Sequence, residues 1–407
     1  MKRLGDSRKF DKGRPLLQNE AFWLIWFACC VFFNFSLGGG IYGSQVLLCI
    51  LLTVWIFRNL FSGRVFRLLP VLVAVIAFSF WELIVAGHGN FHFLPEISKI
   101  LLLGLVTVAI RDLIPKEKMP MVLQFVPLFV ASQVAFTYFT GAWDYYDPLL
   151  HRFGVPALGS PNTTAYVLAF CLIFLHHSLS NSTETPSRVA GIAGYLVIGV
   201  ALIATQSRGG LLIYFAGLFF ISGRKVRFLL LAASGVAIAI MFFSPLGQDI
   251  SRVNVVMDLR ETGGTSRVFI WQQLAQNLLR HPLALITGMG PGATDFYVAE
   301  SDLPIQSTHS MVVEIIYSYG VFGTAIFFWI LTRLWKGAND NSVELRELSL
   351  RKALLAALTV SFLLDSYPLT AQILWFTPVM LYIITASTLR SVALQGPVLL
   401  RLEKKLT

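Results

Sequence analysis

The sequence predicts an all-α, polytopic membrane protein with about twelve transmembrane helices. Apolar runs of about 18–22 residues recur along the 407-residue chain, which is 56% hydrophobic and only 13% charged. Since the bilayer core holds no water to bond the backbone, each of these runs is expected to form a helix. The polar, basic start at residues 1–20 and the absence of a small-residue cleavage pattern argue against a cleavable signal peptide.

The expected spans follow one another with short polar connections and form a single integral membrane domain over residues 1–407. A longer polar segment, residues 245–309, interrupts the series between the ninth and tenth spans. In chain order the expected spans are 21–38, 41–57, 66–86, 95–111, 119–141, 155–177, 189–206, 208–222, 226–244, 310–332, 351–367 and 371–389, with bounds good to about three residues.

The distribution of lysine and arginine predicts which side of the membrane each connection occupies. With twelve spans both termini lie on one side, and that side carries 25 of the 32 basic residues, against seven on the other. Basic residues concentrate on the cytoplasmic side of membrane proteins, so both termini are expected in the cytoplasm and segment 245–309 outside it. In a bacterium this corresponds to a multi-pass inner-membrane protein with a periplasmic loop.

The periplasmic loop is expected to contain an amphipathic helix, in the stretch SRVFIWQQLAQNLLRHP. This helix could lie along the membrane surface, and Pro282 should end it. The glycine-rich TGMGPGATDF that follows is expected to be a loop. The apolar stripe of the helix is expected to comprise Val268, Trp271, Leu274, Leu278 and Leu279.

Arg208 is the first candidate binding residue, because it stands at the tight outer junction of two predicted spans in TQSRGGLL. Arginine binds phosphate oxygens in pairs through its planar guanidinium and does not lose its charge. Gly209 and Gly210 would allow another backbone or a lipid headgroup to come close. The alternative is an interface anchor whose side chain reaches out to water.

The outer loop carries further candidates for binding an anionic substrate. Arg267 and Arg280 flank the predicted amphipathic helix, although a solvated helix face would also explain them. His309, at the mouth of the tenth span, could take a proton from a hydroxyl nucleophile near neutral pH, or could simply cap or anchor that span. Glu314, about one turn further on, could orient His309 or pair with an arginine. Arg152, just before another span, is an additional candidate.

Several function classes are not expected. The net charge of +10 is explained by the basic cytoplasmic connections, so nucleic acid is not an expected partner. The four cysteines fall inside apolar runs and the histidines lack metal-ligand spacing, so no metal site is predicted. The GMGPG stretch lacks the G-K-[ST] ending of a nucleotide loop, and no cofactor is expected.

Five short motifs occur in a characteristic order on the predicted outer face, and in this combination they resemble the O-antigen ligase and O-antigen polymerase superfamily. The usual His-Asn of the fourth motif is His309-Ser310 in this chain. The motifs are SRGG at 207–210, R-x-x-x-W from Arg267 to Trp271, HPL-x-x-x-x-G-x-G from His281 to Gly290, HS at 309–310, and Y-x-x-G-V-x-G ending at Gly323.

The resemblance implies a membrane glycosyltransferase with a C-type glycosyltransferase-like helical fold. Such enzymes transfer a glycan from undecaprenyl diphosphate to an acceptor sugar hydroxyl at the periplasmic face. By carry-over, Arg208 and Arg267 would contact the diphosphate, with Arg280 and Arg152 assisting. His309 would activate the acceptor hydroxyl, with Glu314 and Trp271 in support.

The implied acceptor is either a lipid-linked repeat unit, as for a polymerase of O-antigen or exopolysaccharide, or lipid A–core, as for a ligase. The polymerase is slightly preferred, because of Ser310 and the character of the loop. Membrane lipid and a chain-length regulator protein are further expected partners. A lipid-linked glycan flippase or other transporter is the alternative from another class, but it predicts polar groups near the bilayer midplane and two related halves, which the sequence does not display.

Overall fold

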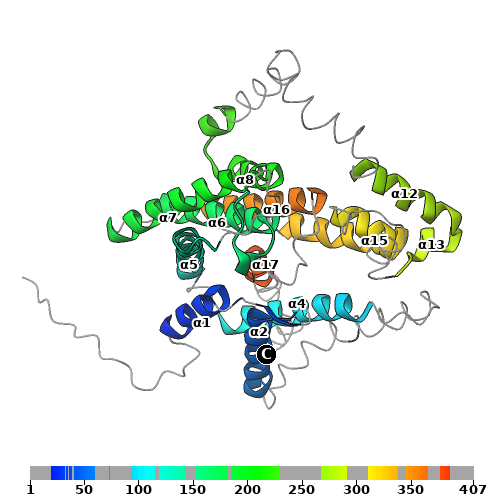
Figure 1. Ribbon diagram of the computed structural model, residues 1–407, viewed down its shortest axis with the longest axis horizontal. Coiled ribbons are helices and arrows are strands. Elements are labelled where there is room, and N and C mark those ends of the chain that lie inside the picture. The colour runs from blue at the N-terminus through cyan, green and yellow to red at the C-terminus, as the bar shows by residue number, and fades with distance from the viewer. Residues whose placement is uncertain are drawn as a thin grey trace, which may run out of the picture.

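The computed structural model describes residues 20–32, 34, 36–38, 41–59, 73, 93–114, 119–142, 152–181, 185–229, 267–290, 310–337, 345–364 and 376–385. Within these ranges the chain is almost wholly helical, as Figure 1 shows, apart from one two-stranded antiparallel sheet, β1 (Ser36–Gly38) and β2 (Ile41–Tyr42). The helices are α1 (Glu20–Phe32), α2 (Gly43–Asn59), α4 (Phe93–Leu113), α5 (Met119–Thr140), the 3₁₀ helix η4 (Pro156–Leu158), α6 (Pro161–Asn181), α7 (Thr185–Ala204), α8 (Arg208–Ile221), α12 (Arg267–Arg280), α13 (Pro282–Thr287), α15 (Met311–Gly337), α16 (Leu345–Leu364) and α17 (Phe376–Thr385).

Among the described residues, four helices are long and apolar enough to cross a membrane: α5, α6, α7 and α15. Three shorter helices, α1, α2 and α8, are also apolar. These helices confirm the predicted helical fold and agree with a membrane protein. The twelve-span count stays a prediction, since spans 66–86 and 226–244 lie largely outside the described residues, as does most of segment 245–309.

Several predicted span bounds were wrong by more than three residues. Polar residues extend helices beyond the apolar run, since α7 begins at 185, α15 ends at 337 and α16 begins at 345, against the predicted 189, 332 and 351. Two other spans were predicted too long: the first helix ends at Phe32 instead of residue 38, because strand β1 begins at Ser36 and pairs with β2. The sixth begins at Pro161 instead of residue 155. Proline is favoured in the first helical turn, where its missing N–H leaves no bond unmade, and Gly159 just before it has a φ of 93°.

Helix α6 forms the centre of the protein. Every residue from Ala165 to Leu175 is buried, as expected of a helix that is apolar on all sides and enclosed by others. Helices α5, α7, α8 and α16 pack against it (Figure 1). The glycines of α8 allow a close approach: a Cβ on Gly217 would lie 2.2 Å from Ile173 Cδ1. The close packing of α8 on α6 therefore depends on small residues of α8 that face larger residues of α6.

The packing contacts fix the relative directions of these helices. Gly210 and Gly217 of α8 face Ala165 and Ile173 of α6 in the same order, so the two helices run parallel. Gly209 and Gly217 face Leu364 and Ala353 of α16, in the reverse order, so α16 runs the opposite way. The starts of α6 and α8 and the end of α16 consequently lie together, at what we call the Arg208 end of the bundle.

Helix α15 connects this bundle to a second, smaller core. Its later part packs on α16, where the rings of Phe327 and Phe362 lie 5.2 Å apart and Trp335 Nε1 donates to Thr359 Oγ1 over 3.4 Å. This order makes the later part of α15 antiparallel to α16. Its first part packs against α12 and α13, at the right of Figure 1.

Candidate functional site

The α7–α8 turn is built to present Arg208. Thr205 and Ser207 are buried in this turn, and Ser207 caps α8 by accepting a hydrogen bond from the backbone N–H of Gly210 over 3.3 Å. Between them Gln206 takes a φ of 52°, which reverses the chain direction. Arg208 then occupies the first position of α8, as the sequence predicted for the junction.

Arg208 is the cation that this arrangement leaves available. Its side chain is exposed, and within the described part of the chain it makes no hydrogen bond or ion pair. The start of a helix also carries a partial positive charge from its unbonded N–H groups. The turn therefore combines a full and a partial positive charge at one point.

Arg152 reaches the same turn from another element. Its Nε donates to the backbone oxygen of Thr205 over 2.9 Å, and its Nη2 donates to Asn162 Oδ1. The neighbouring backbone N–H of Phe153 donates to Ala204 O over 3.0 Å. The structure thus brings Arg152 and Arg208 to one end of the bundle, with Arg152 bonded to the turn that carries Arg208.

The two glycines after Arg208 differ in their surroundings. A Cβ on Gly210 would lie 2.6 Å from Ala165 Cβ and 3.2 Å from Ala165 O, closer than packed atoms approach. A Cβ on Gly209 would find its nearest neighbour at 3.8 Å, which is ordinary contact. Gly210 is therefore needed for the seating of α8 on α6, whereas only Gly209 leaves room beside Arg208.

The predicted amphipathic helix is α12, which ends at Arg280 before Pro282, although a new helix, α13, begins at that proline. The predicted apolar stripe was partly wrong, because Leu279 is 65% exposed. The buried stripe is Ile270, Leu274 and Leu278, with Trp271 half-buried beside it. It faces α13 and α15, and Arg280 follows it in an exposed position.

Two of the sequence motifs meet at a break in α15. The backbone of Gly320 is non-helical, with φ 63° and ψ −162°, inside a helix that is otherwise continuous. The carbonyl of Tyr317 accepts from Met289 N over 2.9 Å, and that of Ser318 accepts from Gly290 N over 3.0 Å. The loop after α13 thus bonds directly to the broken turn of α15.

A partly buried side-chain hydrogen bond reinforces this joint. Asn277 Nδ2 on α12 donates to the hydroxyl of Tyr317 over 2.6 Å. Asn277, Thr205 and Asn162 were not predicted as site residues. None of these three residues lies in any of the five motifs, whereas Tyr317, the hydrogen-bond partner of Asn277, opens the Y-x-x-G-V-x-G motif.

The start of α15 is capped by Ser310. Its Oγ accepts from Val313 N over 3.4 Å, and its carbonyl accepts from Glu314 N over 3.0 Å. Glu314 is half-buried in the first turn of α15. His309, immediately before the cap, and the side chain of Arg267 lie outside the described residues, so their predicted roles stay predictions.

These features define a class of protein: a helical protein with apolar helices of membrane-spanning length, a cationic turn at one end of its bundle, and a second, smaller helical unit joined to the bundle through α15. Residues 193–328, about a third of the chain, match the model of the O-antigen ligase family. The matched segment is thus similar to the O-antigen ligase family, in agreement with the resemblance that its motifs indicated. No curated protein matches the chain.

The matched segment includes Arg208, Arg280 and the joint between α13 and α15, whereas Arg152 precedes it. The match therefore supports a membrane glycosyltransferase of the ligase or polymerase type, and apolar helices of spanning length agree with it.

Proposed function

We propose that this protein transfers a glycan from undecaprenyl diphosphate to an acceptor sugar hydroxyl at the periplasmic face of the bacterial inner membrane. The observation that carries the proposal is Arg208, an exposed cation without a partner among the described residues, set at a helix start inside the family-matched segment. Arginine is the side chain best suited to a diphosphate, because it binds two oxygens at once and stays charged.

The proposed reaction breaks the bond between the anomeric carbon and the diphosphate oxygen and forms one between that carbon and the acceptor oxygen. Charge grows on the departing diphosphate, and Arg208 would stabilise that charge, with Arg152 beside its turn and with Arg267 and Arg280 as further proposed contacts. His309 would take the proton of the acceptor hydroxyl. The donor already carries a good leaving group, so the reaction needs no nucleotide outside the cytoplasm.

The test of this site is transfer by the purified protein with Arg208→Lys and, separately, His309→Ala. We expect severe loss with Arg208→Lys, because a point charge cannot reproduce the paired contact, and complete loss with His309→Ala while the protein stays inserted. Arg188→Lys is the matched control, since Arg188 is exposed near the opposite end of α7. Normal transfer by both site variants would refute the assignment.

For the acceptor we propose a lipid-linked repeat unit, and a polymerase, with the ligase reaction on lipid A–core as the alternative. One of the two grounds for this preference was Ser310, and the structure gives that residue a capping role in α15. The choice therefore rests on experiment. In a deletion strain, a polymerase predicts single repeats still attached to core, whereas a ligase predicts no attached glycan and accumulation of long lipid-linked chains.

A chain-length regulator protein is the proposed protein partner of the polymerase reaction. Its binding would be tested by co-purification, and polymer length would lose its narrow distribution without it.

A further inference from the structure

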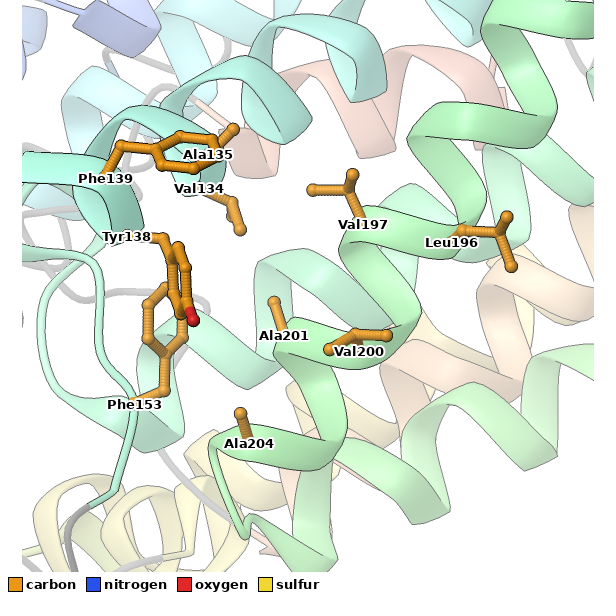
Figure 2. Close-up of a pocket in the computed structure, with 10 residues that line it drawn as sticks. All are labelled: Val134, Ala135, Tyr138, Phe139, Phe153, Leu196, Val197, Val200, Ala201 and Ala204. Carbon is orange, nitrogen blue, oxygen red and sulfur yellow. The ribbon is translucent and has the colours of Figure 1, made fainter.

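An apolar cavity of about 380 Å³ lies between α5 and α7. Its size falls in the range of small-molecule sites. In Figure 2, Tyr138, Phe139 and Phe153 stand on one side of it, and Val197, Val200 and Ala204 of α7 on the other. Only the Tyr138 hydroxyl adds a polar group to these side chains, so a polar occupant would find few partners.

The cavity has a buried floor and an exposed rim. Phe153, Val134 and Ala201 are buried beneath it, whereas Phe139 and Val200 are mostly exposed. Both walls, α5 and α7, are helices long and apolar enough to cross the membrane. A cavity between two such helices, with an exposed apolar rim, opens toward the hydrocarbon of the bilayer.

The cavity ends at the turn that presents Arg208. Ala204, the last residue of α7, lines it, and its carbonyl accepts a hydrogen bond from Phe153, which also lines it. Arg152 precedes Phe153 and bonds to Thr205 of the turn. An apolar cavity and a cationic turn are therefore adjoining parts of one structure, which matches an amphiphile with an anionic head.

We propose that this cavity holds a segment of the donor's isoprenoid chain, next to the diphosphate bound at Arg208. The inference rests on the proposed function, which supplies the donor. Bilayer lipid is as apolar as the cavity, so the chain gains little hydrophobic free energy by entering. The cavity acts by shape: it fixes the chain close to the reacting bond and so orients the diphosphate.

The experiment is photolabelling of the full chain in lipid nanodiscs with undecaprenyl diphosphate that carries a diazirine on its chain, without acceptor. Two α7 variants give a matched pair. Val200→Trp fills the cavity, whereas Ile203→Trp places the same ring outside it, from a side chain that is 68% exposed against 69% for Val200. We expect label on residues 134–139 and 196–204 of the wild type and of Ile203→Trp, and loss to the unirradiated background in Val200→Trp.

Equal labelling of both variants would overturn the proposal. So would labelling of the same residues by a diazirine phosphatidylglycerol that the diphosphate lipid does not displace, because the cavity would then hold bulk phospholipid. Failure of the proposed function gives a different pattern: wild-type protein that is labelled in the cavity but transfers no glycan when acceptor is added.

Discussion

Gly210→Ala is the substitution whose effect the structure specifies most closely. The added methyl would lie 2.6 Å from Ala165 Cβ, whereas packed carbon atoms prefer about 3.5–4.0 Å. Both atoms are fixed to helical backbone, so no side-chain rotation can relieve the overlap. Helix α8 must therefore move away from α6 by about 1 Å, and it takes Arg208 with it.

The cost should appear in both stability and activity. Overpacking of this kind destabilises proteins by about 1–3 kcal/mol. A displacement of about 1 Å in a positioning group can lower the rate by about 100-fold. We therefore expect kcat/KM for glycan transfer to fall by about 100-fold in Gly210→Ala, measured in nanodiscs with purified donor and acceptor, together with a lower thermal unfolding temperature.

Gly209→Ala is the control, since its methyl would have no neighbour closer than 3.8 Å. It should retain wild-type stability, and Gly199→Ala, whose methyl would have no neighbour within 4 Å, should retain wild-type activity as well. If Gly210→Ala were as active as Gly199→Ala, the argument that α8 seating positions Arg208 would be refuted.

Three further predictions concern α15 and its joint with α12 and α13. Ser310→Ala should destabilise the protein by about 1 kcal/mol through loss of the cap, and Ser310→Asn should retain most of that stability in the same thermal melt. Tyr317→Phe removes the acceptor of the Asn277 hydrogen bond, at about 1 kcal/mol, and an Asn277→Ala, Tyr317→Phe double mutant should lose less than the sum of the two single changes. Gly320→Ala should lower the stability of the protein by about 3 kcal/mol or more, because only glycine readily adopts these backbone angles and a Cβ would lie 2.5 Å from Ile286 O. The α12–α13 unit should then become sensitive to limited proteolysis. The control Gly199→Ala, whose Cβ would have nothing within 4 Å, should stay resistant to the protease.

Local sequence patterns correctly predicted the structural features that depend on a single short segment of the chain. The junction at Arg208 was placed correctly, because a polar TQSRGG between two apolar runs admits few alternatives. The same held for the end of α12 before Pro282. Where the apolar pattern continued across the start of a strand or of a helix, as at Ser36 and Pro161, composition alone extended the helix too far.

Pairings between distant segments could not be read from one sequence. Nothing in the local pattern indicates that Arg152 bonds to Thr205, or that Gly210 faces Ala165. Leu279 was assigned to the buried stripe because periodicity identifies an apolar face only approximately, and the true stripe, centred on Leu274, is set by its partner α15. The hydrogen bond between Met289 and Tyr317 likewise depends on the break in α15 at Gly320. The Y-x-x-G-V-x-G motif contains this glycine, but the sequence alone does not show that its backbone is non-helical.

The most direct test of the central claim is the fate of the donor lipid in a reconstituted reaction. Purified protein in nanodiscs would receive glycan-bearing undecaprenyl diphosphate and acceptor, and the two products would be quantified together. We predict one undecaprenyl diphosphate released for each glycan joined, with both products strongly reduced in Arg208→Lys. An intact donor that the wild-type protein in sealed vesicles merely moves from one leaflet to the other would contradict the account and identify a transporter.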